Sequence, residues 1–471
     1  MKLLKDSELV HRALNNTRFT TYWLDSLRPD KVEPSLEADL SCDLLVVGGG
    51  FCGLWGAIQA KEQQPDRDVV LIEAKSIANG ASGRPAAIMS TSVMHGIGNT
   101  ERMFPGEVAK LEVLGQENMD GFRASIEQYN IDCDIEWGGE MTVSVGDEGL
   151  DAIEEEYQLY QKYGHEVQKL SKAEVQSEVN SPIFHAAVWS KNRSGTVHPG
   201  KLVRELKRVA LELGVKIFEY TPHVSNCYHK GLITVLTPRA SIKANKVLLA
   251  TNAWAAGHKR ISTRVSAIRD RILVTEPLTL EQMEKIGWKS RQGIYDTRTQ
   301  LNYMRLTKDN RILFGGRLGY FFGNNTDPLY DKCPKPFIRL VESFYRTFPQ
   351  LKGEGNFSHA WSGPIGLTTR MAVHYQRYHE SNMIFAGGYS GFGVTATRFG
   401  ARVGLAILDQ TDIPETRMTF AITEPNYIPP EPFRWIGAKI TMYALDTLDE
   451  KRGWRLLWVK MVQKMGFPIT L

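Results

Sequence analysis

A glycine-rich turn at residues 48–53 has the residue types and spacing of a loop that binds a dinucleotide. The run Gly48-Gly49-Gly50-Phe51-Cys52-Gly53 satisfies the pattern GxGxxG. Gly48 permits a tight turn, Gly50 lets the backbone approach a pyrophosphate, and Gly53 lets a helix and a strand pack closely. The helix that follows would present the N–H groups of Phe51 and Cys52 to the phosphates. The alternative is a strand-to-helix turn without a ligand.

A carboxylate follows this turn by about 20 residues, as the dinucleotide-binding pattern requires. It belongs to Glu73, which ends an apolar run and precedes Ala74. Such a carboxylate can accept two hydrogen bonds from a ribose diol, and its charge disfavours a 2′-phosphate. We therefore predict a dinucleotide other than NADP, with Glu73 and Ala74 at its ribose.

The elements that position these residues form a parallel α/β unit. Residues 43–47 (DLLVV) predict a strand, the glycine turn opens an alanine-rich helix, and residues 69–72 predict a second strand. Strands at 215–220, 232–237 and 244–251 are expected to return to the same sheet. This context favours the ligand-binding interpretation of the turn.

Periodicity elsewhere predicts helices at 107–129, 149–163 and 200–213, the last ended by Gly214. Residues 134–145 are expected to be extended. Residues 265–320 alternate short strand-like runs with turns, which indicates an antiparallel sheet in a second domain. Residues 383–388 (MIFAGG) predict another strand, a glycine turn and a helix from about Val394 to Leu408.

Composition excludes several classes of protein. A chain of 471 residues favours two domains, and a formal net charge of +4 without a long basic run argues against a nucleic-acid partner. The five cysteines are odd in number and widely spread, so they predict neither a disulfide framework nor a metal site. No signal peptide and no apolar run of about 18 residues is found, so we expect a cytoplasmic protein.

Four further segments occur in an order typical of one family. They are Gly80-Ala81-Ser82-Gly83-Arg84, Leu248-Leu249-Ala250-Thr251-Asn252-Ala253-Trp254, Ile312-Leu313-Phe314-Gly315-Gly316-Arg317 and Ala386-Gly387-Gly388-Tyr389-Ser390-Gly391-Phe392-Gly393-Val394. With the first glycine turn, this series resembles the D-amino-acid-oxidase-type FAD-dependent oxidoreductases, which include glycine and sarcosine oxidases and gamma-glutamylputrescine oxidoreductases.

The resemblance implies FAD as the cofactor. Relatives with covalently attached flavin carry a late cysteine close to the position of Trp361-Ser362, where this sequence has none, so we expect FAD to be non-covalent. The start of the last helix would stabilise the negative charge of a reduced flavin. Beyond the first turn and Glu73, the resemblance implies FAD contacts at Ala81, Ser82, Gly83, Arg84, Val224, Thr251, Asn252, Gly388, Ser390, Gly391, Gly393 and Val394.

The resemblance also implies an α/β (α+β) fold, with a GR2-type FAD-binding Rossmann-like domain and an antiparallel-sheet substrate domain. We expect a lead-in at residues 1–40 and a discontinuous FAD-binding domain at 41–105, 195–262 and 355–410. The substrate domain is expected at 106–194 and 263–354, followed by a C-terminal tail with amphipathic helices at 411–471.

The family's reaction is removal of a hydride from the carbon that bears an amine, which gives an imine. Tyr303 and Arg305 alternate along LNYMRL and are expected to share one face of a strand. Arg317 follows a glycine pair, and Trp361 lies in a segment that passes under the flavin in relatives. We predict these four as substrate-site residues; the alternative for each arginine is a surface charge or an internal ion pair.

The tail contains apolar residues at helical spacing on one face and basic residues on the other. The apolar set is Trp454, Leu457, Trp458, Met461, Val462 and Met465. Such a helix packs on the body of its own protein, or it contacts a membrane surface or a partner protein. The sequence does not decide between these alternatives.

Two other functions compete with amine oxidation. One is a non-catalytic FAD-binding assembly or scaffold protein, and the other is an NAD-dependent dehydrogenase. Within the amine-oxidising hypothesis the substrate stays open among amino acids, N-methyl amino acids, conjugated polyamines and aminophosphonates. The electron acceptor also stays open between oxygen and another acceptor.

Overall fold

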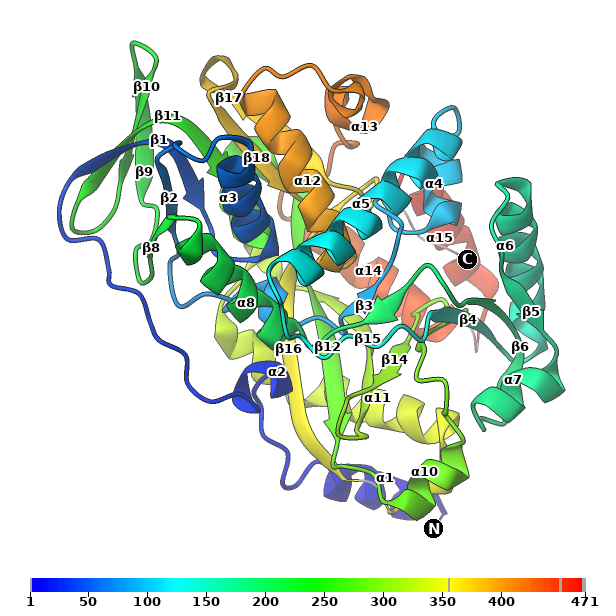
Figure 1. Cartoon of the computed structure of the whole chain (residues 1–471). Helices are drawn as coiled ribbons and strands as arrows, with labels where there is room; N and C mark the ends of the chain where they lie inside the picture. Colours follow the sequence, from blue (N-terminus) through cyan, green and yellow to red (C-terminus); the bar gives the residue numbers. More distant parts are fainter. Residues whose placement is uncertain (1, 355, 449–450, 468–471) are drawn as a thin grey trace.

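The computed structural model describes residues 2–354, 356–448 and 451–467, and two eight-stranded sheets dominate it (Figure 1). The first sheet has the order β17-β18-β11-β1-β2-β8, and β10 and β9 extend it beside β11. Its strands are β1 (Leu40–Val47), β2 (Val69–Ile72), β8 (Lys216–Phe218), β9 (Ser225–His229), β10 (Leu232–Leu236), β11 (Ser241–Leu249), β17 (His374–Tyr378) and β18 (Met383–Gly387).

The centre of this sheet is parallel, as the sequence predicted. β1 lies between β2 and β11, and β18 pairs with β11 in the same direction. All four residues of β2 are buried, because helices cover one face and the β9–β10 hairpin and the turn after β11 cover the other. The predicted return of the chain to the first sheet is confirmed.

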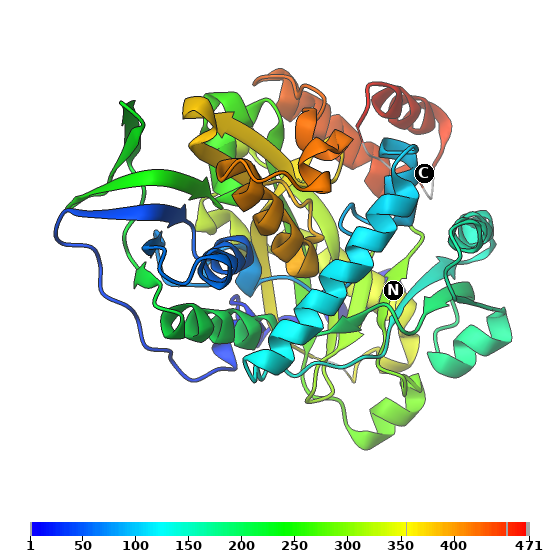
Figure 2. The same cartoon turned by 45° about the horizontal axis from the view of Figure 1, so that its top comes forward.

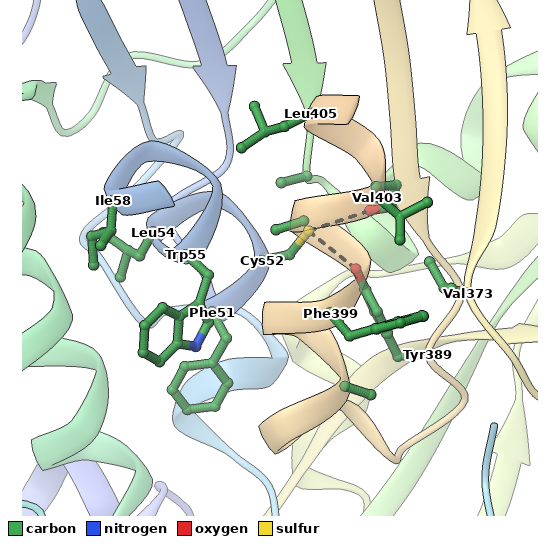
Figure 3. Close-up of a cluster of buried hydrophobic side chains, with 14 of the residues drawn as sticks. Phe51, Cys52, Leu54, Trp55, Ile58, Val373, Tyr389, Phe399, Val403 and Leu405 are labelled. Carbon is green, nitrogen blue, oxygen red and sulfur yellow. Dashed lines mark hydrogen bonds between the residues drawn. The ribbon is translucent and has the colours of Figure 1, made fainter. Parts of the chain in front are cut away.

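Helices α3 (Phe51–Gln63), α8 (Pro199–Glu212) and α12 (Gly393–Leu408) cover that face of the sheet, and α5 (Val108–Gln128) packs on α12 (Figures 1 and 2). Figure 3 shows α3 packed against α12, with the Cys52 sulfur between the Ala386 carbonyl, at 3.8 Å, and the Tyr389 hydroxyl, at 3.2 Å. The side chain of Cys52 therefore belongs to the core. Gly214 takes a φ of +86° just after α8, which confirms the predicted helix end.

The second sheet has the order β16-β12-β15-β14-β13-β4-β6-β5 and is antiparallel except where β13 lies parallel to β4. Its strands are β4 (Glu140–Val145), β5 (Gln168–Leu170), β6 (Phe184–Ser190), β12 (Val265–Thr275), β13 (Gly293–Asp296), β14 (Tyr303–Leu306), β15 (Ile312–Tyr320) and β16 (Phe357–Thr368). A small pair, β3 (Ile88–Met89) and β7 (Gly195–Thr196), lies apart from both sheets. Apolar residues of α11 (Pro334–Thr347), such as Phe344, pack on one face of the second sheet.

One predicted boundary needs correction. The sequence predicts that the FAD-binding domain resumes at residue 355, but β16 pairs with β12 along its length, from Phe357 opposite Thr275 to Thr368 opposite Val265. The chain thus leaves the second sheet only after residue 368. The long antiparallel partner could not be identified from the local sequence.

The remaining helices lie around the two sheets. They are α1 (Lys2–Ala13), α2 (Tyr22–Asp25), α4 (Ile97–Met103), α6 (Leu150–Lys162), α7 (Lys172–Glu178), α9 (Lys259–Ser262), α10 (Leu280–Ile286), α13 (Thr419–Ile422), α14 (Phe433–Leu448) and α15 (Gly453–Lys464). The N-terminal segment before β1 contributes to the core. Trp23 is 1% exposed, and its indole N–H donates to the Pro85 carbonyl at 2.8 Å.

The predicted C-terminal helix is α15, and it packs on α14 near α4 in both views (Figures 1 and 2). Val462 is buried and the Trp458 indole donates to Thr441 at 3.0 Å, whereas Trp454, Leu457, Met461 and Met465 are exposed. One part of the apolar face therefore packs on the protein itself. No helix in the described part of the chain is both long and apolar enough to span a bilayer.

Candidate active site

The first glycine turn joins β1 to α3, and other backbone atoms lie close to two of its glycines. Gly48 has a φ of +111°, and a Cβ on it would lie 2.8 Å from the Ala250 carbonyl oxygen. A Cβ on Gly53 would lie 1.9 Å from the Gly48 oxygen. Gly53 therefore serves close packing of helix and strand, the role that the sequence predicted.

Ser82 ties the second predicted segment to this turn. Its hydroxyl accepts a hydrogen bond from the Phe51 N–H at 2.9 Å, and a Cβ on Gly50 would lie 2.8 Å from that hydroxyl oxygen. The first N–H of α3 is thus used inside the protein rather than left for a phosphate. The glycine at position 50 permits the approach of Ser82 as well as that of a ligand.

Glu73 is held rigidly beside the turn. One carboxylate oxygen accepts the Gly49 N–H at 2.8 Å and the other accepts the Lys75 N–H at 3.0 Å. Burial raises the pKa of Glu73, and these backbone donors oppose that shift. Each oxygen keeps a further lone pair, so the fixed carboxylate can still accept hydrogen bonds from a diol.

The second glycine turn, between β18 and α12, is fixed by side chains from two other segments. The Gly388 N–H, at a φ of +83°, donates to the Asn252 side-chain oxygen at 2.9 Å. Ser390, also left-handed, accepts the Thr368 N–H at 3.2 Å and donates to the Gly388 carbonyl at 3.1 Å. These bonds hold the turn against the end of β16.

One continuous cavity of about 2100 Å³ passes both turns. Its lining includes 16 of the 19 residues predicted to bind the cofactor: Gly48, Gly50, Phe51, Cys52, Glu73, Ala74, Ala81, Ser82, Arg84, Val224, Thr251, Asn252, Ser390, Gly391, Gly393 and Val394. The volume exceeds the roughly 300–1,000 Å³ of an ordinary ligand pocket, so it suits a dinucleotide together with a substrate.

Three predicted cofactor residues lie behind the wall instead of lining the cavity. They are Gly53, Gly83 and Gly388. A Cβ on Gly83 would lie 2.3 Å from the Ala78 oxygen, so this glycine allows a tight turn in the segment after Glu73. All three shape the loops that carry the lining residues.

Arg305 also lies outside the lining, which corrects its expected role as a substrate contact. Its guanidinium donates to the backbone carbonyls of Val197, at 2.6 Å, and Ala87, at 3.2 Å, and the side chain is buried. Although it shares a strand face with Tyr303, its length carries the charged group past the cavity. Arg305 supports the segment that forms the wall.

Trp361 lines the cavity from β16 and is 2% exposed. Its indole N–H donates to the Arg84 carbonyl at 2.9 Å, and the Arg84 guanidinium donates to the Ser362 carbonyl at 2.8 Å. The two segments therefore hold each other in place. This reciprocal contact positions Arg84 at the cavity.

Arg317 reaches the cavity from an irregular part of β15. The register with β12 shifts beside it, and Arg317 has a φ of +68°. Nη1 donates to Asp446 of α14 at 2.7 Å, while Nε is buried and has no hydrogen-bond partner among the described residues. A buried donor without a partner is rare, so Nε is available to a ligand.

Tyr303 lines the cavity, and its hydroxyl donates to Asp270 of β12 at 2.6 Å. Asp270 also accepts the Arg271 N–H at 2.8 Å. Burial raises the pKa of Asp270 and raises that of Tyr303 well above its ordinary value. The strands of the second sheet thus place a polar pair opposite the glycine turns.

The sequence did not identify two parts of the lining. Glu140, Glu156 and Tyr295 line a region near β4, and residues of α14 and α15 such as Ile436 and Trp458 line another. The alternation in EMTVSV places Glu140 on the polar face of the strand with Thr142 and Ser144, so the sequence does not distinguish it from an exposed residue. The sequence does not show that α14 and α15 line the cavity, because local spacing does not reveal contacts between residues more than 100 positions apart.

The sequence profile of the family described as FAD dependent oxidoreductase (DAO) matches residues 43–404. The chain belongs to this family. The gamma-glutamylputrescine oxidoreductase of Escherichia coli is 30% identical over 377 residues, which are 78% of this chain and 84% of the relative. The probable oxidoreductase OrdL of Haemophilus influenzae is 29% identical, over 81% of this chain and 86% of the relative.

Solved structures show the same fold. Glycine oxidase from Geobacillus kaustophilus superposes with a TM-score of 0.67 at 17% identity, covering 79% of this chain and 96% of that one. L-Proline dehydrogenase from P. horikoshii gives 0.64 at 22% identity, covering 82% and 96%. The predicted fold class and family are therefore confirmed.

The cavity fits the cofactor of the DAO family. Gly48 and Gly50 expose backbone to the cavity, backbone N–H groups hold the Glu73 carboxylate at the lining, and a second glycine turn faces the same cavity. FAD needs all three because it is longer than one strand-helix-strand unit can bind. The protein is thus an FAD-dependent oxidoreductase.

Proposed function

We propose that this oxidoreductase converts the C–N bond of a small primary or secondary amine to an imine. The bound FAD would supply the chemistry by accepting a hydride from the carbon that bears the nitrogen. The substrate class comprises amino acids, N-methyl amino acids, conjugated polyamines and aminophosphonates. The second substrate is oxygen or another electron acceptor.

One observation carries this proposal: a single cavity joins both glycine turns to the polar face of the second sheet. A substrate there lies between the cofactor cradle and Tyr303, Arg317 and Trp361. The names of similar proteins support the chemistry, since gamma-glutamylputrescine oxidoreductase and the structurally similar glycine oxidase both act on amines. Non-covalent binding of FAD is part of the proposal.

The residues of the second sheet prepare the amine. An ammonium group cannot release a hydride from its carbon until it has lost a proton. The Asp270 carboxylate lines the cavity and accepts a hydrogen bond from the Tyr303 hydroxyl. Burial raises the pKa of Asp270, which makes it a stronger base than an exposed aspartate. We assign Asp270 as the acceptor of that proton, and Arg317 Nε as a donor to a polar substituent.

The apolar residues of the lining exclude water from the reacting carbon. Trp361, which is buried, lines one side, and Met442 of α14 lines another. An apolar surround strengthens the hydrogen bonds that orient the amine, because fewer water molecules compete for them.

An anaerobic screen of amines tests the proposal. The purified yellow protein is mixed with each amine without oxygen, and the flavin absorbance is followed. We expect at least one amine to bleach the flavin. If dithionite bleaches it and no amine of any class does, the protein is a non-catalytic flavoprotein and the proposal is wrong.

A further inference from the structure

The cavity extends past the second glycine turn into a recess between β4, β6 and α6. In Figure 1, α6 stands beside these strands at the edge of the molecule. The recess is lined by Glu140 and Thr142 of β4, Val188 and Ser190 of β6, and Glu156 and Tyr160 of α6. It therefore combines two carboxylates with neutral polar groups.

Neither carboxylate has a basic partner. Glu140 accepts a hydrogen bond from the Ser90 hydroxyl at 3.2 Å, and Glu156 accepts one from the Thr142 hydroxyl at 3.0 Å. Within the described ranges, no lysine, arginine or histidine forms an ion pair with Glu140 or Glu156. A buried carboxylate is stable in its charged form when it is paired, so a cation that enters the recess would find two carboxyl groups without a basic partner.

A second observation is independent of the carboxylates. The Ser190 side chain is 3% exposed, and its hydroxyl has no hydrogen-bond partner among the residues described. Ser190 lies directly opposite Glu140 in the β4–β6 ladder, so both side chains are on the same face. This buried hydroxyl at the recess is free to form a hydrogen bond with a molecule bound there.

The arginines nearest to the recess are bound by other residues. Arg193 pairs with Glu112 at 2.9 Å and donates to the Thr91 hydroxyl. Arg102 of α4 also lines the cavity and donates to the Asn99 side chain at 2.9 Å. Among the described residues, neither arginine donates a hydrogen bond to Glu140 or Glu156, so both carboxyls can receive a cation from a ligand.

Without a cation in the recess, both carboxyl groups resist ionisation. Burial, followed by the charge of Glu156, raises the pKa of Glu140 to about 8. Burial raises the pKa of Glu156 to about 7. A cation in the recess would lower both values, because it stabilises the charged form.

The recess is connected to the flavin end of the cavity by aromatic rings. Phe392 precedes α12 in the second glycine turn, and its ring centroid lies 6.0 Å from that of Tyr295. Glu140 acts electrostatically on Tyr295, and both residues line the cavity. An extended molecule can therefore reach from the second glycine turn to Glu140 and Glu156.

We propose that the recess binds a second, protonated nitrogen of the substrate, and that the substrates are diamines or polyamine conjugates with a cationic far end. This inference rests on the proposed amine oxidation. Glu140 and Glu156 would pair with the ammonium group, Ser190 would accept a hydrogen bond from it, and the faces of Tyr160 and Tyr295 would add cation–π attraction.

Binding to the reduced holoenzyme tests the inference without turnover. The flavin is first reduced with dithionite, so that amines bind but are not oxidised. Calorimetry then compares each α,ω-diamine of three to six carbons with the monoamine of the same length. The proteins are wild type, the double variant Glu140→Gln/Glu156→Gln, and Glu154→Gln as control. Glu154 lies on α6 outside the cavity lining, where it pairs with Lys169.

We expect one diamine to bind wild type at least about tenfold more tightly than its monoamine, the effect of one charge-assisted contact. The double variant should reduce this preference below about threefold, and the control should keep it. FAD content and melting temperature establish that each variant is folded. A preference that is absent in wild type, or retained in the double variant, would overturn the inference.

The two proposals fail separately. If amines bleach the flavin but the double variant keeps its preference for diamines, amine oxidation stands and the recess has another role. If diamine binding requires both carboxylates but no amine bleaches the flavin, the cation site stands and the proposed reaction is wrong.

Discussion

The substitution Glu73→Gln tests how the cofactor is held. It keeps the shape of the side chain and removes its charge. Glu73 uses one oxygen for the Gly49 N–H, at 2.8 Å, and the other for the Lys75 N–H, at 3.0 Å. An amide offers only one acceptor oxygen, so its NH₂ group would face one of these backbone donors.

The expected effect on FAD follows from the loss of a charged acceptor. A hydrogen bond to a charged group contributes about 1.5–3 kcal/mol, so the loss of one ribose contact raises the Kd for FAD by about 10- to 150-fold. Titration of the apoprotein with FAD, followed by flavin fluorescence, measures this change. The control is Glu37→Gln, which alters an exposed carboxylate paired with Arg239.

Stability must be measured beside affinity, because the backbone contacts are also disturbed. A purely structural role would lower the melting temperature of the apoprotein and leave the Kd for FAD unchanged. If the Kd of Glu73→Gln stays within about twofold of wild type, Glu73 does not contact the ribose and the cofactor assignment is wrong.

Three further predictions concern packing, substrate contact and pH. Gly53→Ala should destabilise the protein by about 1–3 kcal/mol, because its Cβ would lie 1.9 Å from the Gly48 oxygen; an unchanged melting temperature would contradict this. Arg317→Ala should lower the second-order rate constant of flavin reduction by about tenfold or more. Arg339→Ala removes the other partner of Asp446 and should leave this rate constant unchanged. Equal effects of the two substitutions would make Arg317 a structural residue. Because burial raises the pKa of Glu140 from 4.5 to about 8, the native state loses stability relative to the unfolded chain as pH rises between these values. Glu140→Gln should therefore melt above wild type at pH ~8 and close to it at pH ~5, and a difference equal at both pH values would refute that reasoning.

The parts of the fold carried by local patterns could be predicted from the sequence. The strand, glycine turn and helix around Gly48 and the helix end at Gly214 depend on neighbouring residues, and both are confirmed. The family resemblance added the second glycine turn and Trp361, which line the same cavity in the structure.

Features that depend on distant pairing could not be predicted. β16 joins the second sheet through β12, about 90 residues earlier, and no local signal distinguishes this pairing from one in the first sheet. The carboxylates of Glu140 and Glu156 become one site only because α6 folds back over β4. Arg305 shares a strand face with Tyr303, but the length of an arginine side chain decides which groups it reaches.

A single-turnover experiment tests the central claim that this flavoprotein oxidises the carbon beside an amine nitrogen. A reactive diamine and its analogue deuterated at the carbons beside nitrogen are each mixed with the oxidised holoenzyme without oxygen. We predict that the flavin bleaches, that deuterium slows the bleaching, and that one equivalent of carbonyl product per FAD is recovered after hydrolysis of the imine. Bleaching without carbonyl product, or no bleaching by any amine, would contradict the account.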